Sequence, residues 1–356
     1  MGYFRPEFTQ MILILLMRYD YIRFAKGLAI FTIILYHALQ RLPLDGLAAR
    51  AIILGGTGVH LFFLLSGFGL ALSKSSTSTM AFYQRRLTKI WVPYVLALSI
   101  SLLLAFYPGL FEQGRREWLA GISGYQMFSE HDIQGFGGHF WFISTILQFY
   151  LVFPWLKKGL ERMSSPLRFA GTALLISLLW WCTVYLLDKG HLRIWNSFFL
   201  QFLWEFALGM ALAKVMQNDP LPRWFQLLKK QWTPEHWWKW AAGGILGVLM
   251  MALLVLKGGK IGPIFNDVPA LAGYGMLTVS VWLAGMRFFP KLNDFFIQTG
   301  DFSYSLYLTH VIALEALLYF LRQNSLSFNL FWILVFVPAA LFFAKIFEQL
   351  SRRLYN

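Results

Sequence analysis

Long apolar stretches separated by short polar segments recur along the whole of this 356-residue chain. Each is about 17–25 residues long, which is what a helix needs to cross the hydrocarbon of a bilayer. The pattern predicts ten membrane-spanning helices, over residues 24–40, 56–73, 90–107, 140–156, 169–187, 195–214, 241–256, 267–286, 303–321 and 330–347. The longest connections leave no room for a soluble domain, so we expect an all-α integral membrane protein built as one helical bundle.

The expected bundle occupies residues 18–350, with an N-terminal extension over 1–17 and a short cytoplasmic tail over 351–356. The apolar run at 11–16 is short and is followed by Arg18 and Asp20 rather than by the small residues of a cleavage site. We therefore expect no cleavable signal peptide. Met17 offers an alternative start, which would make the extension of little consequence.

Composition agrees with a membrane protein. Hydrophobic residues make up 58% of the chain and charged residues 13%, whereas a soluble domain has about 25% charged residues. The mean hydropathy is +0.55. The single cysteine, Cys182, excludes a disulfide and a cysteine-based zinc site within one chain, and no residue pattern suggested a metal site.

The basic residues set the expected orientation. If the N-terminus is cytoplasmic, 22 of the 31 Lys and Arg residues lie in or beside cytoplasmic segments. This asymmetry follows the positive-inside rule, and it places both termini in the cytoplasm. The net charge of +14 then reflects topology and contact with anionic lipid, and it does not indicate nucleic-acid binding.

The first predicted helix carries titratable groups in an otherwise apolar segment, which favours a functional role. Lys26 and His37 are 11 residues apart, so a helix places them within about 20° of one face and about 16 Å apart along its axis. Arg23 falls near the same face. A neutral imidazole suits proton removal from a hydroxyl. A lysine at the membrane edge with a structural histidine is an equally simple interpretation.

Three further segments carry polar groups. In the segment 58–69, Ser66 beside a glycine is more typical of a helix contact than of a nucleophile, and His60 suits a polar contact or an acceptor site. The other two sets are a cation cluster near the third span (Arg85, Arg86 and Lys89) and a polar half-span near the ninth (Ser303, Tyr304, Ser305, Tyr307 and His310). Clustered cations suit phosphates, although positive-inside charge explains them equally well. The polar half-span either lines a cavity or joins helices.

Taken together, these segments resemble the membrane-bound acyltransferase 3 family, which includes bacterial O-antigen and enterobacterial common antigen O-acetylases. The resemblance covers about Arg18 to Phe347 and rests on five motifs in register. They are Lys26 with His37; Phe62, Phe63, Ser66, Gly67 and Phe68; Arg86, Lys89, Pro93 and Tyr94; His139, Trp141, Tyr150 and Pro154; and the Ser-Tyr-Ser-x-Tyr-Leu-x-His run at 303–310. Lysine replaces the family's arginine at 26 and 89.

The resemblance implies transfer of an acyl group, often acetyl, from acyl-CoA to a hydroxyl of a cell-surface or lipid-linked glycan. It implies His37 as the general base. The donor phosphates would contact Lys26, Arg85, Arg86 and Lys89. The cavity would be lined or supported by Arg23, Ser66, His139, Trp141, Tyr304, Tyr307 and His310.

The same resemblance implies no permanently bound cofactor and no required metal, with acyl-CoA as a substrate. The other expected partners are the glycan acceptor and membrane lipids, and the expected location is the bacterial cytoplasmic (inner) membrane. An alternative from another class is a transporter or flippase for a glycan or an acylated intermediate, because intramembrane polar residues also line transport pathways. The sequence shows neither the internal repeat nor the paired broken helices that are typical of transporters.

Overall fold

The computed structural model describes residues 6–73, 78–107, 110–111, 114–217 and 223–355, and these residues form helices and connections without a strand. The α-helices are α1 Pro6–Leu39, α2 Gly46–Ile53, α3 Gly58–Leu72, α4 Thr79–Leu104, α5 Arg115–Ser123, α6 Trp141–Arg162, α7 Pro166–Leu186, α8 Arg193–Asn196, α9 Leu203–Met216, α10 Arg223–Lys230, α11 Trp237–Lys257, α12 Gly262–Phe265, α13 Asp267–Phe288, α14 Pro290–Asp301, α15 Ser303–Gln323 and α16 Leu330–Tyr355. Four 3-10 turns complete the set: η1 Leu54–Thr57, η2 Tyr125–Phe128, η3 Asp132–Gly137 and η4 Pro234–His236. The prediction of an all-α protein is confirmed.

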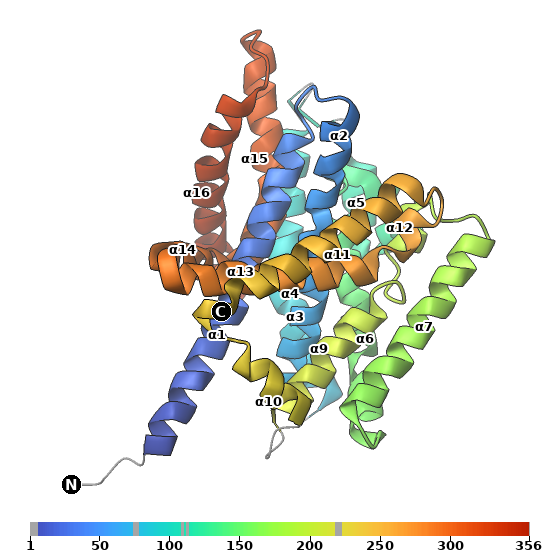
Figure 1. The fold of residues 1–356 in the computed structure, drawn as a ribbon. Helices are drawn as coiled ribbons and strands as arrows, with labels where there is room; N and C mark the ends of the chain where they lie inside the picture. The colour runs from blue at the N-terminus through green and yellow to red at the C-terminus, as the bar shows by residue number, and fades with distance from the viewer. Residues whose placement is uncertain (1–5, 74–77, 108–109, 112–113, 218–222, 356) are drawn as a thin grey trace.

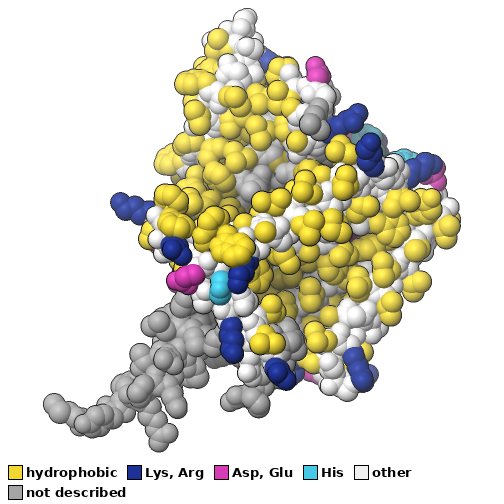
Figure 2. All heavy atoms as spheres, viewed as in Figure 1, with side chains coloured by type: hydrophobic (Ala, Val, Ile, Leu, Met, Phe, Trp, Pro, Cys, Tyr) yellow, Lys and Arg dark blue, Asp and Glu magenta, His cyan; other side chains and the backbone are white. Residues whose placement is uncertain are grey.

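Within the described residues, eight helical segments are long and apolar enough to cross a membrane. They are Tyr19–Leu39, Ala48–Leu72, Thr79–Leu104, Pro166–Leu186, Pro234–Lys257, Asp267–Phe288, Ser303–Gln323 and Leu330–Leu354. Hydrophobic side chains cover most of the visible face of the bundle, while Lys and Arg side chains lie at its margins (Figure 2). An exposed apolar surface of this extent is what lipid contact requires.

The other two predicted spans differ from these eight. The segment 140–156 lies in α6, a helix of 22 residues whose first half is mostly buried within the protein. The segment 195–214 is broken, because the short α8 ends at Asn196 and α9 begins only at Leu203. The 14 residues of α9 extend about 21 Å, less than the thickness of a bilayer core of about 30 Å. The prediction of one continuous helix over 195–214 is therefore wrong.

Neighbouring side chains stabilise the break between α8 and α9. Three donors reach backbone carbonyls of this segment: Thr145 Oγ1 to Ser197 at 2.6 Å, Ser177 Oγ to Leu200 at 2.8 Å and Trp181 Nε1 to Gln201 at 3.1 Å. Non-helical backbone at membrane depth is tolerated where the protein itself supplies such partners. The apolar composition of 195–214 carries no information about these bonds, so hydropathy alone predicts an unbroken helix.

The helices pack in pairs that are joined by the long α1. Helix α11 lies against α13, α3 against α9, α1 against α14 and α15 against α16. In Figure 1, α11 and α13 cross the front of the bundle, with the α15–α16 pair at one side and α7 at the other. Helix α1 continues through the expected boundary after residue 17, and α16 continues through the expected tail to Tyr355.

Two glycines allow α3 and α9 to approach closely. A Cβ atom at Gly67 would lie 2.0 Å from the Phe206 carbonyl oxygen, and one at Gly209 would lie 2.0 Å from the Leu64 carbonyl oxygen. Small residues at helix crossings are characteristic of membrane bundles. The helix-contact interpretation of the segment around Gly67 is thus the one that the packing supports.

Stacked aromatic rings form the core beside this crossing. Phe149 of α6 stacks on Phe206 of α9 with ring centroids 4.3 Å apart, and Phe63 of α3 stacks on Phe202 at 4.4 Å. Phe63, Phe149 and Phe206 are fully buried. Aromatic pairs of this kind add about 0.5–1.5 kcal/mol beyond their burial, and they fix the three helices whose ends border the cavity described below.

Substitution of Gly67 by Ala should destabilise the bundle, because its Cβ meets a backbone carbonyl that only a shift of α3 or α9 can relieve. Overpacking of this kind costs about 1–3 kcal/mol. Gly69→Ala is the matched control, since a Cβ there has no neighbour within 4 Å. Thermal unfolding of the detergent-purified proteins should show a lower midpoint for Gly67→Ala only, and equal midpoints for the two variants would contradict the close crossing.

Candidate functional site

One cavity brings together several of the sequence motifs. Its volume is about 730 Å³, within the usual range of about 300–1,000 Å³ for small-molecule sites. It lies beside the C-terminal end of α1, the start of α3, the loop before α6 and the segment before α9. The ionisable side chains in the lining include those of His37, His60, His139, Arg193, Asp267 and Tyr307.

Three histidines from distant parts of the chain form a cluster, and two of them, His37 and His139, line this cavity. The ring centroid of His310 lies 5.1 Å from that of His37 and 5.1 Å from that of His139. They come from α15, from α1 and from the loop before α6. His310 is fully buried and His139 is 3% exposed, whereas His37 is half-buried and lines the cavity. His37 is therefore the member of the cluster best placed to meet a substrate.

The hydrogen bonds of His310 fix its tautomer. Its Nδ1 lies 2.7 Å from the Tyr307 carbonyl oxygen and 3.2 Å from that of Leu306. A carbonyl oxygen only accepts, so Nδ1 carries the proton and a neutral His310 keeps its lone pair on Nε2. This Nε2 is buried and has no hydrogen-bond partner among the described residues.

The loop that carries His139 is held against α15. The Tyr307 hydroxyl donates to the His139 carbonyl oxygen. Gly137 and Gly138 adopt φ values of +94° and +70°, which favour glycine. A Cβ at Gly137 would also lie 2.6 Å from Val311 Cγ1. The two glycines thus let the loop pass close to α15 and bring His139 to the cluster.

An aromatic ring and a guanidinium form another part of the wall. The Arg193 guanidinium lies over the Trp141 ring, 5.3 Å from its centroid, a cation–π arrangement. The backbone amides of Arg193 and Ile194 donate to the Glu130 carboxylate at 2.7 and 2.9 Å. These bonds satisfy the first amides of α8 and hold Arg193 at the cavity.

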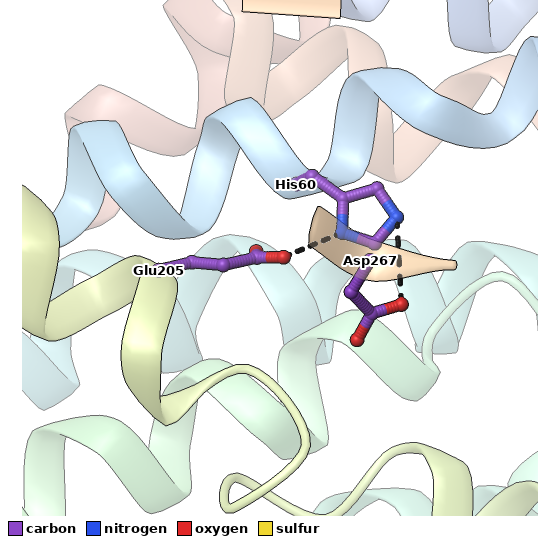
Figure 3. A group of neighbouring side chains, drawn as sticks. All are labelled: His60, Glu205 and Asp267. Atoms are coloured by element: carbon purple, nitrogen blue, oxygen red, sulfur yellow. Dashed lines mark hydrogen bonds and ion pairs between the residues drawn. The ribbon is translucent and has the colours of Figure 1, made fainter. Parts of the chain in front are cut away.

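A second histidine group faces the same cavity. His60 of α3 lies between the carboxylates of Glu205 and Asp267 (Figure 3). Its Nδ1 is 2.7 Å from Glu205 Oε1, and its Nε2 is 4.0 Å from Asp267 Oδ1. All three residues are buried. The sequence suggested a polar contact for His60, and the structure supplies two acidic neighbours.

The expected donor-binding cations divide into two pairs. Arg86 of α4 and Asp301 at the end of α14 lie within electrostatic range of Lys26, so Lys26 and Arg86 share one region toward the N-terminal part of α1. Arg85 and Lys89 are exposed. The structure therefore brings two of the four predicted cations, both half-buried, within electrostatic range of each other and leaves the other two exposed.

The sequence of the chain matches the model of a known protein family. The family model described as an acyltransferase domain matches residues 19–347. The chain belongs to the acyltransferase 3 family. With its apolar helices, this acyltransferase is a multi-pass membrane protein. Searches of curated proteins and of solved structures gave no significant match.

Four of the residues expected to line or support the cavity of this acyltransferase lie outside its lining: Arg23, Ser66, Tyr304 and the buried His310. Arg23 Nε binds Asp301 Oδ1 at 2.6 Å and so joins α1 to α14. The Tyr304 hydroxyl donates to the Ile90 carbonyl oxygen at 2.8 Å and joins α15 to α4. Ser66 is half-buried on α3, beside the glycine of the helix crossing. The contacts of Arg23 and Tyr304 hold neighbouring helices together.

The sequence reasoning missed Glu205 and Asp267. Glu205 falls inside the predicted span 195–214, and Asp267 is the first residue of the span 267–286. An ionisable residue within a membrane span is a functional hypothesis by default, and this holds for the two acids as it does for His37. The signal for both residues was present in the sequence.

The Arg23–Asp301 pair should stabilise the packing of α1 on α14. The side chains are 27% and 45% exposed and form two contacts, so their coupling should approach the upper part of the range of about 0.2–1 kcal/mol for exposed pairs. A double-mutant cycle with Arg23→Gln and Asp301→Asn, followed by thermal unfolding, measures it. The more exposed Lys260–Asp188 pair is the matched control and should show little coupling. Additive midpoint shifts at Arg23 and Asp301 would argue against this role.

Proposed function

We propose that the protein transfers an acyl group, by family default acetyl, from acyl-CoA to a hydroxyl of a glycan or lipid-linked sugar. The observation that carries the proposal is the position of His37 in the cavity, beside two buried histidines, on the helix that also carries Lys26. An acyl-CoA-dependent transferase needs a cationic site for the phosphates of the donor and, further along, a base near the thioester. Lys26 and His37 are placed on one helix in a way that suits these two roles. The family match gives no support to the transporter alternative.

Lys26 and Arg86 are the residues that we assign to the phosphates of the donor. A guanidinium offers fork-shaped donors and an ammonium offers a compact charge, and both suit phosphate groups. Eleven residues of helix separate Lys26 from His37, a rise of about 16 Å. The extended pantetheine arm of CoA would run along this part of α1 and carry the thioester toward His37.

His37 then acts as the general base. Its unprotonated nitrogen accepts the proton of the acceptor hydroxyl while the hydroxyl oxygen forms a bond to the thioester carbonyl carbon. The carbon–sulfur bond breaks, and the CoA sulfur leaves with the proton that His37 had accepted. General-base assistance contributes about 10²- to 10⁴-fold in rate, and holding the two substrates together contributes more.

Other residues of the cavity lining suit a polyhydroxylated acceptor. Trp141 offers an aromatic ring, and Gln201, Asn196 and Asp267 offer amide and carboxylate groups within the same lining. Sites of this kind use a few polar groups to orient their ligand. The basic residues predict that the N-terminus lies in the bacterial cytoplasm. The C-terminal end of α1, which carries His37, would then lie toward the outer face of the inner membrane, where lipid-linked and surface glycans are presented.

Replacement of His37 by Ala should lower the rate of acyl transfer by about 10²- to 10⁴-fold, while the KM for acetyl-CoA changes little. The assay follows release of the CoA thiol by purified protein that is supplied with acetyl-CoA and lipid-linked glycans. His236→Ala is the matched control, because His236 lies outside the cavity lining and bonds Thr233. Full activity in His37→Ala would remove His37 as the base.

Replacement of Arg86 by Gln should weaken acetyl-CoA binding by about tenfold or more, since a hydrogen bond to a charged group contributes about 1.5–3 kcal/mol. Arg86→Lys should lose less, because it keeps the charge. Arg85→Gln is the control, as the exposed Arg85 bonds the Ala81 carbonyl of its own helix. Titration calorimetry gives the affinities, and equal values for all four proteins would contradict the phosphate role.

A further inference from the structure

His60, Glu205 and Asp267 are supplied by three different helices. His60 lies near the start of α3, Glu205 in the first turn of α9 and Asp267 at the start of α13. One donor atom from each residue can be chosen so that all three atoms lie within 4.8 Å of one another. The tertiary fold therefore assembles the group, and the break before α9 determines where Glu205 stands.

The orientation of His60 leaves one ring nitrogen available. Its Nδ1 is 2.7 Å from Glu205 Oε1. When Glu205 is ionised its carboxylate only accepts, so Nδ1 then carries the proton and a neutral His60 keeps its lone pair on Nε2. Histidines that bind metals are commonly held in this way, with the second nitrogen donating to a carboxylate.

The spacing on the other side of His60 is too long for a hydrogen bond. Its Nε2 lies 4.0 Å from Asp267 Oδ1 (Figure 3), whereas hydrogen bonds between such atoms are about 2.7–3.2 Å. Two metal–ligand bonds of about 2.0–2.2 Å at a tetrahedral angle place their ligand atoms about 3.3–3.6 Å apart. Side-chain rotation that closes the observed gap by about half an ångström would let one ion bond both atoms.

Charge balance also favours a divalent ion. Glu205 is fully buried, Asp267 is 4% exposed, and among the described residues both are paired with the same basic side chain, His60. A protonated imidazole balances one carboxylate, whereas a divalent cation balances both. Buried charges without a partner are strongly destabilising.

Unpartnered oxygens at the group are an independent observation. Gln201 is 2% exposed and donates from Nε2 to Asp267 Oδ2 at 2.8 Å, so its amide lies directly beside that carboxylate. Within the described part of the chain, its Oε1 is buried without a partner, and so is Glu205 Oε2. Buried polar atoms are rarely left unpaired, and both of these are of the type that binds cations.

We propose that His60, Glu205 and Asp267 form a binding site for a divalent first-row metal ion, Zn²⁺ or Mn²⁺. His60 Nε2 and Asp267 Oδ1 are the direct ligands, and Glu205 holds the ring and supplies the second negative charge. An imidazole with carboxylates suits these ions, whereas Mg²⁺ and Ca²⁺ prefer all-oxygen sites. His60, Gln201 and Asp267 line the cavity, so an ion there is accessible from it.

Metal content of the full-length protein tests the proposal without any acyl-transfer assay. Detergent-purified protein is stripped with a chelator, equilibrated with Zn²⁺, Mn²⁺ or Mg²⁺, and analysed by inductively coupled plasma mass spectrometry. We expect about one Zn²⁺ or Mn²⁺ per chain and no comparable uptake of Mg²⁺. Asp267→Asn and His60→Ala should lose the ion, and Glu205→Gln should bind it at least tenfold more weakly. Asp188→Asn, which removes an exposed carboxylate, should match the wild type.

Thermal unfolding keeps the test valid if a variant folds poorly. Added Zn²⁺ or Mn²⁺ should raise the midpoint of the stripped wild type, because a ligand that binds only the folded state stabilises it, and should not raise that of Asp267→Asn. Absence of bound ion in the wild type would overturn the proposal and leave protons as the counter-charge of the two acids. Equal uptake by the wild type and Asp267→Asn would also overturn it. Neither result depends on whether the protein transfers acyl groups.

Discussion

In hydrocarbon every backbone amide and carbonyl needs a partner within the protein, and the architecture follows from this requirement. It explains why the described residues form helices and connections. It also explains how the chain can be non-helical between α8 and α9, because Thr145, Ser177 and Trp181 take over the carbonyls that a helix would satisfy. Because α9 begins only after this interruption, Glu205 in its first turn lies beside His60.

Helix α1 connects the two chemical regions of the molecule. Lys26 lies among charged groups at one level of the helix, and His37 lies at the cavity at another. A single rigid element therefore sets the distance between the proposed donor phosphates and the proposed base. The bond from Arg23 to Asp301 holds α1 against α14 near Lys26. It therefore also fixes the position of Lys26 relative to the rest of the bundle.

The sequence predicted the helical membrane architecture because lipid-facing residues leave a strong apolar signal in each segment. It failed at 195–214, since hydropathy records the apolar side chains but not the side-chain hydrogen bonds that replace helical ones. His37 was found because an imidazole is unusual in such a segment. The approach of His139 to His310 depends on how α15 packs against a glycine loop, which no local pattern describes. Glu205 and Asp267 stand in the sequence as acids within predicted spans, but their approach to His60 depends on how α3, α9 and α13 pack.

The bond from Tyr307 to the His139 carbonyl has a mechanical consequence. Tyr307 and His310 belong to α15, and the contact of Gly137 with Val311 adds a second point of attachment for the loop. Displacement of α15 would therefore carry His139 and His310 together and leave their separation unchanged. The part of the cavity wall that is built from α15 and this loop therefore moves as one unit.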